Sequence, residues 1–153
     1  MIKIDKIIVE GADQQGKSQL CEKLSQTLGW PIIHFDKPDE KFDFHSHYIT
    51  PKKTISDRNF VSEMVYSLFR DQKHRVKNPV ELQKIFESQN CLFILVDREE
   101  DFVFDSERNE AFSYDQILAA RKMYEAIFYA VSMNKIRVNP NNLARLMQLF
   151  QIM

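Results

Sequence analysis

The stretch that most constrains the fold of this chain is GADQQGKS, at positions 11–18. It matches the pattern G-x-x-x-x-G-K-[ST], in which backbone N–H groups and a lysine surround bound phosphate groups. An apolar, β-branched run, KIIV at 6–9, precedes it, and Leu20, Leu24 and Leu28 follow at helical spacing. Strand, loop and helix therefore come in the order in which loop amides and a helix N-terminus converge on phosphate.

The side chains of this loop predict a division of roles. Lys17 is expected to contact the β- and γ-phosphates of a nucleotide, and the Ser18 hydroxyl is expected to bind Mg²⁺. The remaining phosphate contacts are assigned to the loop and the first helical turn, namely Gly11, Gln14, Gln15, Gly16 and Gln19. ATP and Mg²⁺ are thus the expected cofactors.

The rest of the chain alternates between strand and helix patterns. Further strands are predicted at 31–35, 52–56, 92–96 and 135–139, and helices at 59–72, 79–89, 114–133 and 141–151. This alternation predicts an α/β protein with a three-layer P-loop NTPase fold, a parallel five-stranded sheet with helices on both faces. We expect a single kinase-like domain over 1–153, with a short lid over about 98–112.

Composition narrows the class of protein. A net charge of −1 argues against a nucleic-acid binder that is cationic over its whole surface, although it does not exclude a local basic groove. The longest apolar run, CLFILV at 91–96, is far too short to span a membrane, and the first residues lack the apolar core of a signal peptide. We therefore expect a cytoplasmic protein without a membrane partner, in which Cys21 and Cys91 are reduced, packed thiols.

The acidic residue inside the loop needs an explanation. Asp13 lies within a predicted polyanion site, where like charges at contact distance repel by about 1 kcal/mol in water and several-fold more in a drier site. Its carboxylate is therefore expected to point at something other than the phosphates.

Four segments, taken in order, resemble thymidylate kinases and their deoxynucleoside-kinase relatives. They are IIVEGADQQGKSQL at 7–20, SDRNFVSEMVYS at 56–67, LFILVDREEDF at 92–102 and FSYDQILAARKMYEAI at 112–127. The segment at 56–67 resembles the Asp-Arg motif of that family, with Asp57, Arg58, Ser62 and Tyr66 at its recurring positions. The resemblance implies an ATP-dependent phosphotransferase that acts on a deoxynucleoside monophosphate.

The resemblance also implies roles for individual residues. Asp13 faces the deoxyribose of the acceptor and accepts a hydrogen bond from its 3′-hydroxyl. Asp57 binds Mg²⁺ or its waters, and Arg58 binds a phosphate, to which the guanidinium fork is suited. Glu10 orients the acceptor or its water.

Phosphoryl transfer also needs a cation above the phosphates and exclusion of water. Arg98 and Arg108 flank an acidic run, and Arg121 lies on the helix that follows it. Each is a candidate, and the alternative is that this acidic run forms only a solvated loop.

Two departures from the family leave the acceptor open. FDKPD at 35–39 replaces an Arg-Glu-Pro-type motif, and the region before Asp57 that should grip the base is short. The residues there that are suited to stack on a base are Phe42, Phe44, His45 and Tyr48. The sequence HSH at 45–47 lacks a third ligand for a metal.

Three alternatives therefore stay open beside a nucleotide acceptor. The acceptor is a nucleoside, or it is a hydroxyl of DNA bound through basic residues at 52–54 and 73–77, or the chain is a non-catalytic nucleotide-binding protein. Base preference and a homodimeric state are not determined by the sequence.

Overall fold

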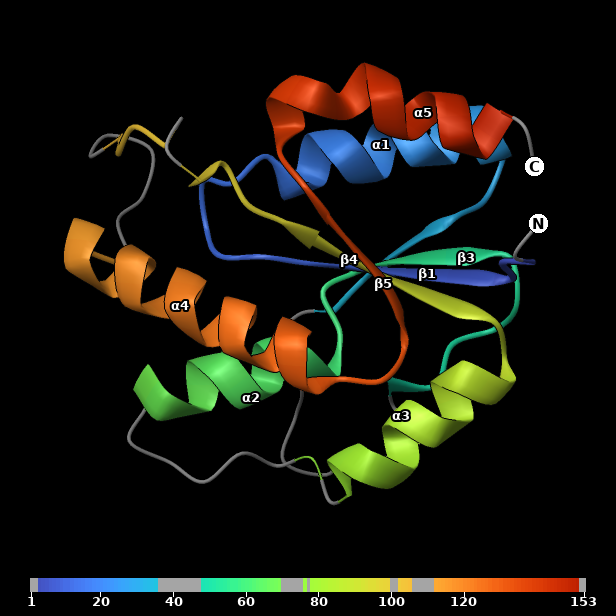
Figure 1. The fold of residues 1–153 in the computed structure, drawn as a ribbon, viewed down its shortest axis with the longest axis horizontal. Helices are drawn as coiled ribbons and strands as arrows, with labels where there is room; N and C mark the ends of the chain where they lie inside the picture. Colours follow the sequence, from blue (N-terminus) through green and yellow to red (C-terminus); the bar gives the residue numbers. More distant parts are fainter. Residues whose placement is uncertain are drawn as a thin grey trace.

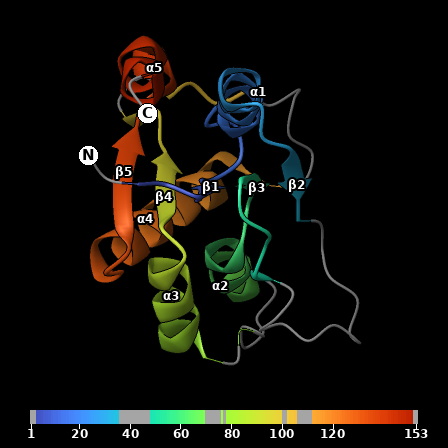
Figure 2. The ribbon, with the colours of Figure 1, turned by 90° about the vertical axis from the view of Figure 1, so that its right-hand side faces the viewer.

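A computed structural model describes residues 3–35, 48–69, 76, 78–99, 102–105 and 112–151 of the chain. Five parallel strands form one sheet in the order β2-β3-β1-β4-β5 (Figures 1 and 2). They are β1 (Lys6–Glu10), β2 (Ile32–His34), β3 (Thr54–Asp57), β4 (Cys91–Val96) and β5 (Asn134–Val138).

Helices cover both faces of the sheet. One face carries α1 (Lys17–Leu28) and α5 (Leu143–Gln151), and the opposite face carries α2 (Phe60–Phe69), α3 (Pro79–Ser88) and α4 (Tyr114–Ala130) (Figure 1). The predicted α/β class, with a parallel five-stranded sheet between two helical layers, is confirmed.

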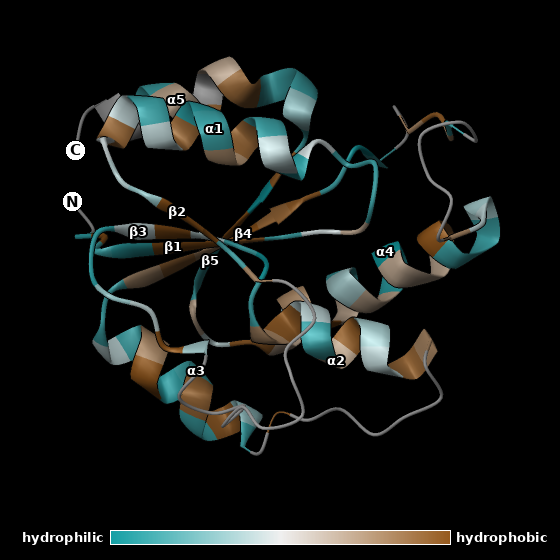
Figure 3. Cartoon of the chain, turned by 180° about the vertical axis from the view of Figure 1, so that it is seen from behind, coloured by the Kyte–Doolittle hydropathy of each residue, from teal (hydrophilic) through white to brown (hydrophobic). Residues whose placement is uncertain are grey.

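The alternation of side chains along the strands produces two apolar cores. Ile7 and Val9 of β1 pack against the α1 and α5 side, whereas Ile8 packs against the side of α2, α3 and α4. Hydrophobic residues gather in strands such as β4, while the helices mix hydrophobic and hydrophilic residues (Figure 3). Because both faces of the sheet are covered, its central strands read as continuous apolar runs rather than as alternating ones.

Several predicted boundaries were wrong for local backbone reasons. β3 begins at Thr54 rather than 52, because Lys53 has a φ of 59° and cannot continue an extended strand. α4 ends at Ala130 because Val131 is extended, and α5 begins at Leu143 because a 3₁₀ turn, η3 (Pro140–Asn142), precedes it.

The two loop glycines lie where a side chain cannot fit. A Cβ on Gly11 would lie 2.6 Å from the carbonyl oxygen of Val96, at the end of β4. Gly16 has a φ of 89°, and a Cβ there would lie 2.8 Å from Pro140. The loop backbone therefore packs directly against the end of β4 and the segment that follows β5, at the edge where the strands have their carboxyl ends.

Both cysteines are buried and unpaired, as expected. Burial raises the pKa of each thiol to about 12, so both are inert at neutral pH. Within the described residues, no helix combines the length and the apolar character needed to span a bilayer.

Candidate functional site

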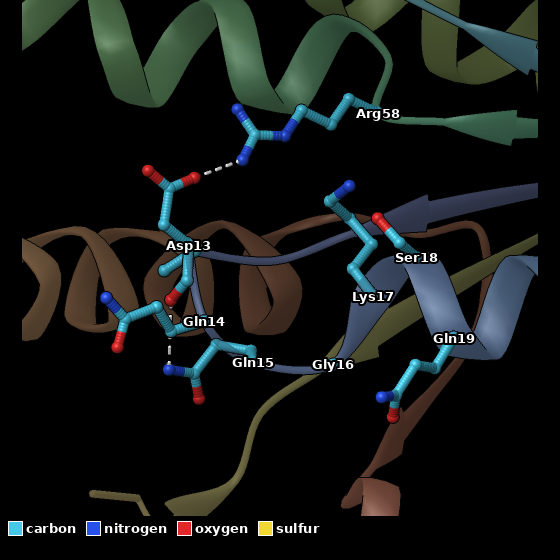
Figure 4. Close-up of a pocket in the computed structure, with 9 residues that line it drawn as sticks. Asp13, Gln14, Gln15, Gly16, Lys17, Ser18, Gln19 and Arg58 are labelled. Carbon is cyan, nitrogen blue, oxygen red and sulfur yellow. Dashed lines mark hydrogen bonds and ion pairs between the residues drawn. The ribbon is translucent and has the colours of Figure 1, made fainter. Parts of the chain in front are cut away.

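A pocket, called here the loop pocket, opens at the carboxyl edge of the sheet (Figure 4). It is lined by Ala12, Asp13, Gln14, Gln15, Gly16, Lys17, Ser18, Gln19 and Arg58. α1 begins in this pocket at Lys17, after the N-cap residue Gly16, with no side-chain cap and no acidic residue in its first turn. Its first N–H groups and its positive dipole end are therefore available to an anion.

Asp57 lies between two basic side chains at this edge. Its Oδ1 accepts a hydrogen bond from the Lys17 ammonium, and its Oδ2 lies 2.9 Å from Nδ1 of His34. The side chains of Lys17 and Asp57 are about 10% exposed, so their ion pair is well shielded from water. A phosphate that enters the pocket must therefore compete with Asp57 for Lys17.

The oxygen donors at this edge suit Mg²⁺. Ser18, which follows Lys17, offers a hydroxyl, and Asp57 offers a carboxylate, both of which are hard oxygen ligands. Among the described residues, no group of three or more His, Cys, Asp or Glu side chains is arranged to hold a metal ion.

The Asp13 carboxylate points at Arg58 (Figure 4). Arg58 Nη2 lies 2.5 Å from Asp13 Oδ1, and the Tyr66 hydroxyl donates to the same oxygen at 3.3 Å. The Arg58 guanidinium also lies over the Tyr66 ring, 4.9 Å from its centroid. Asp13 is thus in contact with two residues that lie 45 and 53 positions later in the chain, and a cation balances the negative charge inside the loop.

Glu10 is fully buried and does not line the loop pocket. Its carboxylate accepts hydrogen bonds from the N–H groups of Asn59 and Ser62 and from the Ser62 hydroxyl, at 2.7–2.8 Å. It therefore fixes the start of α2, directly after Asp57 and Arg58. The resemblance implied that Glu10 orients the acceptor or its water. In the structure its carboxylate contacts Asn59 and Ser62, at the start of α2.

Glu10 gives the protein a testable pH dependence. Burial raises its pKa from 4.5 to about 7, even though three hydrogen bonds oppose the shift. A folded-state pKa above the unfolded value contributes stability that is complete below pH 4.5 and is lost as the pH rises through about 7. Relative to Glu10→Gln, the free energy of unfolding of the wild type should fall by up to roughly 3 kcal/mol across this window. Urea titrations at several pH values measure this, with the exposed Glu22→Gln as the control, and parallel profiles for wild type and Glu10→Gln would refute it.

A tyrosine from α4 joins the same hydrogen-bonded group. The hydroxyls of Tyr124 and Ser62 are 2.7 Å apart, and the ring of Tyr124 packs edge to face on the ring of Tyr66, with centroids 6.3 Å apart. Burial raises the pKa of Tyr66 to about 12, so its hydroxyl stays neutral and able to donate to Asp13 at neutral pH. The sequence pointed to Tyr124 only as part of a family-like helix and did not reveal this contact.

The arginines predicted for the lid have different surroundings. Arg98 Nη2 lies 3.7 Å from the point that a Cβ on Gly16 would occupy. Arg121 instead donates to the carboxylate of Asp97 and to the carbonyl oxygen of Glu99, so it holds the segment after β4 rather than the pocket. Arg108 lies outside the described residues.

Asp97 is a residue at the edge of the site for which no role was predicted. It directly follows β4 and forms ion pairs of 2.7 Å with Arg121 and 2.6 Å with Arg137. Burial opposes its charge, but the hydrogen bonds from Glu99 N–H and the two arginines outweigh burial and hold its pKa below the ordinary value. The only sequence signal was its place after a buried strand.

The residues proposed for a base or for DNA contribute little to the described pocket. Tyr48 is buried and packs on Phe35, with ring centroids 5.5 Å apart, so it belongs to the core. Residues 52–53 precede β3 and lie at the edge opposite the loop pocket. The remaining candidates lie outside the described residues, namely Phe42, Phe44, His45, His47, residues 73–75 and Lys77.

Comparison with known proteins identifies the fold. No protein-family model matches the sequence, and no curated protein is significantly similar to it. Solved structures do match. YorR from Bacillus subtilis, in complex with phosphorylated GDP, has a TM-score of 0.67 and 19% identity, covering 97% of this chain and 98% of YorR.

Two further matches are nucleotide-metabolising kinases. Deoxyadenosine kinase from M. mycoides, with dCMP and dCDP bound, has a TM-score of 0.55 and 15% identity over 97% of this chain and 100% of the kinase. Thymidylate kinase from Candida albicans has a TM-score of 0.52 and 17% identity over 98% and 91% of the two chains. At these identities the matches establish that this chain has the fold of P-loop nucleotide kinases.

Proposed function

We propose that this protein is an ATP- and Mg²⁺-dependent phosphotransferase whose acceptor is a deoxynucleoside monophosphate. The observation that carries the proposal is the composition of the loop pocket, where the uncapped start of α1 and the cations of Lys17 and Arg58 converge. Such a site suits phosphoryl transfer, in which catalysis consists mainly of positioning and of stabilising negative charge.

In this proposal the pocket has a donor side and an acceptor side. Lys17, the Ser18 hydroxyl and the first N–H groups of α1 form the donor side, to which a polyphosphate is expected to bind. Asp13, Arg58 and Tyr66, which contact one another, form the acceptor side, where the carboxylate is expected to accept from a sugar hydroxyl and the guanidinium to bind a phosphate. An acceptor that carries both a hydroxyl and a phosphate gives Asp13 and Arg58 a new partner each, in place of the ion pair between them.

The reaction needs no buried base. The γ-phosphorus of ATP loses its bond to the β–γ bridging oxygen and gains one to an anionic oxygen of the acceptor phosphate, so ADP and a diphosphate form. A monophosphate oxygen is already deprotonated at neutral pH, so no proton has to be removed before it attacks. Ser18 and Asp57 would hold Mg²⁺, which would neutralise negative charge on the phosphate oxygens. Lys17 and Arg58 stabilise the charge that develops during transfer.

An acceptor screen tests this proposal. γ-Labelled ATP is offered with deoxynucleoside monophosphates, with nucleosides and with single-stranded DNA. Label should enter deoxynucleoside diphosphates. Label in nucleoside monophosphates would identify a nucleoside as the acceptor, and label in DNA, in a reaction that weakens as salt is added, would identify a hydroxyl of DNA. ATP binding without transfer would indicate a non-catalytic nucleotide-binding protein.

The Asp-Arg pair gives a second test. Asp57→Asn is expected to raise the Mg²⁺ concentration for half-maximal activity at least about tenfold, because it removes the charged metal ligand. Arg58→Ala should lower kcat/KM for the monophosphate about 100-fold and leave ATP affinity largely intact. Magnesium titrations and acceptor kinetics measure these effects, and wild-type behaviour of both variants would remove Asp57 and Arg58 from the site.

A further inference from the structure

Two glutamines occupy variable positions of the loop and share an unusual arrangement. The amides of Gln14 and Gln15 lie on the side of the loop away from Arg58 (Figure 4). There they meet the residues that follow β4, which we call the β4 extension and which comprise Asp97–Glu99 and Phe102–Asp105.

Gln14 pairs with the far end of the β4 extension. Its Nε2 donates to the carbonyl oxygen of Asp105 at 2.8 Å, and its Oε1 accepts the N–H of Asp105, also at 2.8 Å. One side-chain amide thus satisfies both backbone groups of one residue, as a neighbouring strand would. The backbone of Gln14 has a φ of 64°, a value that residues other than glycine rarely adopt.

Gln15 attaches the near end of the β4 extension. It is 1% exposed, its Oε1 accepts the N–H of Arg98 at 2.9 Å, and its Nε2 donates to the carbonyl oxygen of Asp13 at 3.3 Å. The carbonyl oxygen of Arg98 accepts a hydrogen bond from Asn139 at 3.2 Å. The backbone of Arg98 is therefore held on both sides.

The side chain of Arg98 lies beside the phosphate loop with an unsatisfied donor. Its Nη2 is near Gly16, and its Nε is buried without a hydrogen-bond partner in the described part of the chain. A buried donor without a partner is unfavourable, and this one lies beside the anion-binding loop, where a ligand oxygen can complete it.

We propose that Gln14 and Gln15 are positioning residues that hold the β4 extension against the loop, so that Arg98 contacts the polyphosphate of the bound nucleotide. This inference rests on the proposed function, because it concerns the same donor site. It assigns Arg98, rather than Arg121, as the cation that the extension brings to the phosphates.

Amide hydrogen exchange of the ligand-free protein tests the attachment without reference to activity. Gln15→Ala should speed exchange of the backbone N–H of Arg98 about tenfold, and Gln14→Ala should do the same for the backbone N–H of Asp105. In each case the N–H loses the side-chain oxygen that accepts its hydrogen bond. Gln15→Glu keeps an oxygen for the Arg98 N–H and should retain protection. Val103→Ala changes an 80% exposed side chain of the same segment and serves as the control. Unchanged exchange in both alanine variants would overturn the proposal.

ATP titration calorimetry tests the consequence. Arg98→Ala and Gln15→Ala should each weaken ATP binding about tenfold. The double variant should bind ATP little more weakly than either single variant, because both changes remove the same contact between Arg98 and the polyphosphate. Fully additive losses, or no loss in either variant, would overturn the positioning role. Lys17→Ala tests the proposed donor site separately from the positioning role of Gln14 and Gln15. An unchanged ATP affinity in Lys17→Ala would overturn the donor site itself.

Discussion

Replacing Lys17 with alanine is expected to lower phosphoryl transfer from ATP by at least about 100-fold, the scale of losing one preorganised electrostatic stabiliser. The fold should persist, because Lys17 lies at the pocket rather than in either apolar core, and Asp57 keeps His34 as a partner. Steady-state kinetics and thermal melting measure the two effects. Lys23→Ala, an exposed change on the same helix, is the matched control, and near-normal activity of Lys17→Ala would remove the loop from the chemistry.

The second large effect concerns the acceptor side. If the Asp13 carboxylate accepts a hydrogen bond from the sugar 3′-hydroxyl, Asp13→Asn should lower acceptor efficiency about ten- to a hundredfold, since bonds to charged groups contribute roughly 1.5–3 kcal/mol. ATP affinity should be retained, because the carboxylate points at Arg58 and not at the donor side.

A 3′-deoxy acceptor makes this prediction specific. With the wild type, the 3′-deoxy acceptor should lose as much efficiency as the normal acceptor loses with Asp13→Asn. Combining the 3′-deoxy acceptor with Asp13→Asn should cause little further loss, because both changes remove the same interaction. Tighter ATP binding by Asp13→Asn, with no coupling to the 3′-hydroxyl, would instead mean that the loop acid only repels phosphate.

The fold could be predicted because its signals are local. The apolar run that forms β4 was predicted within one residue, and the leucines of α1 mark the helical face that packs on the sheet. The boundary errors came from single backbone conformations, such as the left-handed φ of Lys53, which residue type does not reveal.

The site was predictable only in part, because much of it depends on contacts between distant segments. Lys17, Asp57 and Arg58 carry motif signals, and the pairing of β3 with β1 brings them together. The partners of Gln14 and Gln15 lie 91 and 83 positions away in the chain, and no local pattern relates them. Glu10 resembled a site acid because it adjoins the loop, yet the inward direction of its side chain depends on how α2 packs.

The most direct test of the central claim is a single-turnover experiment with protein in excess over γ-labelled ATP, in the presence of Mg²⁺ and all four deoxynucleoside monophosphates. The account predicts that label leaves ATP and appears in at least one deoxynucleoside diphosphate, and that Lys17→Ala abolishes this transfer on the same timescale. Label that stays in bound ATP, or that passes only to inorganic phosphate, would contradict the assignment of this pocket as the site of a nucleotide kinase.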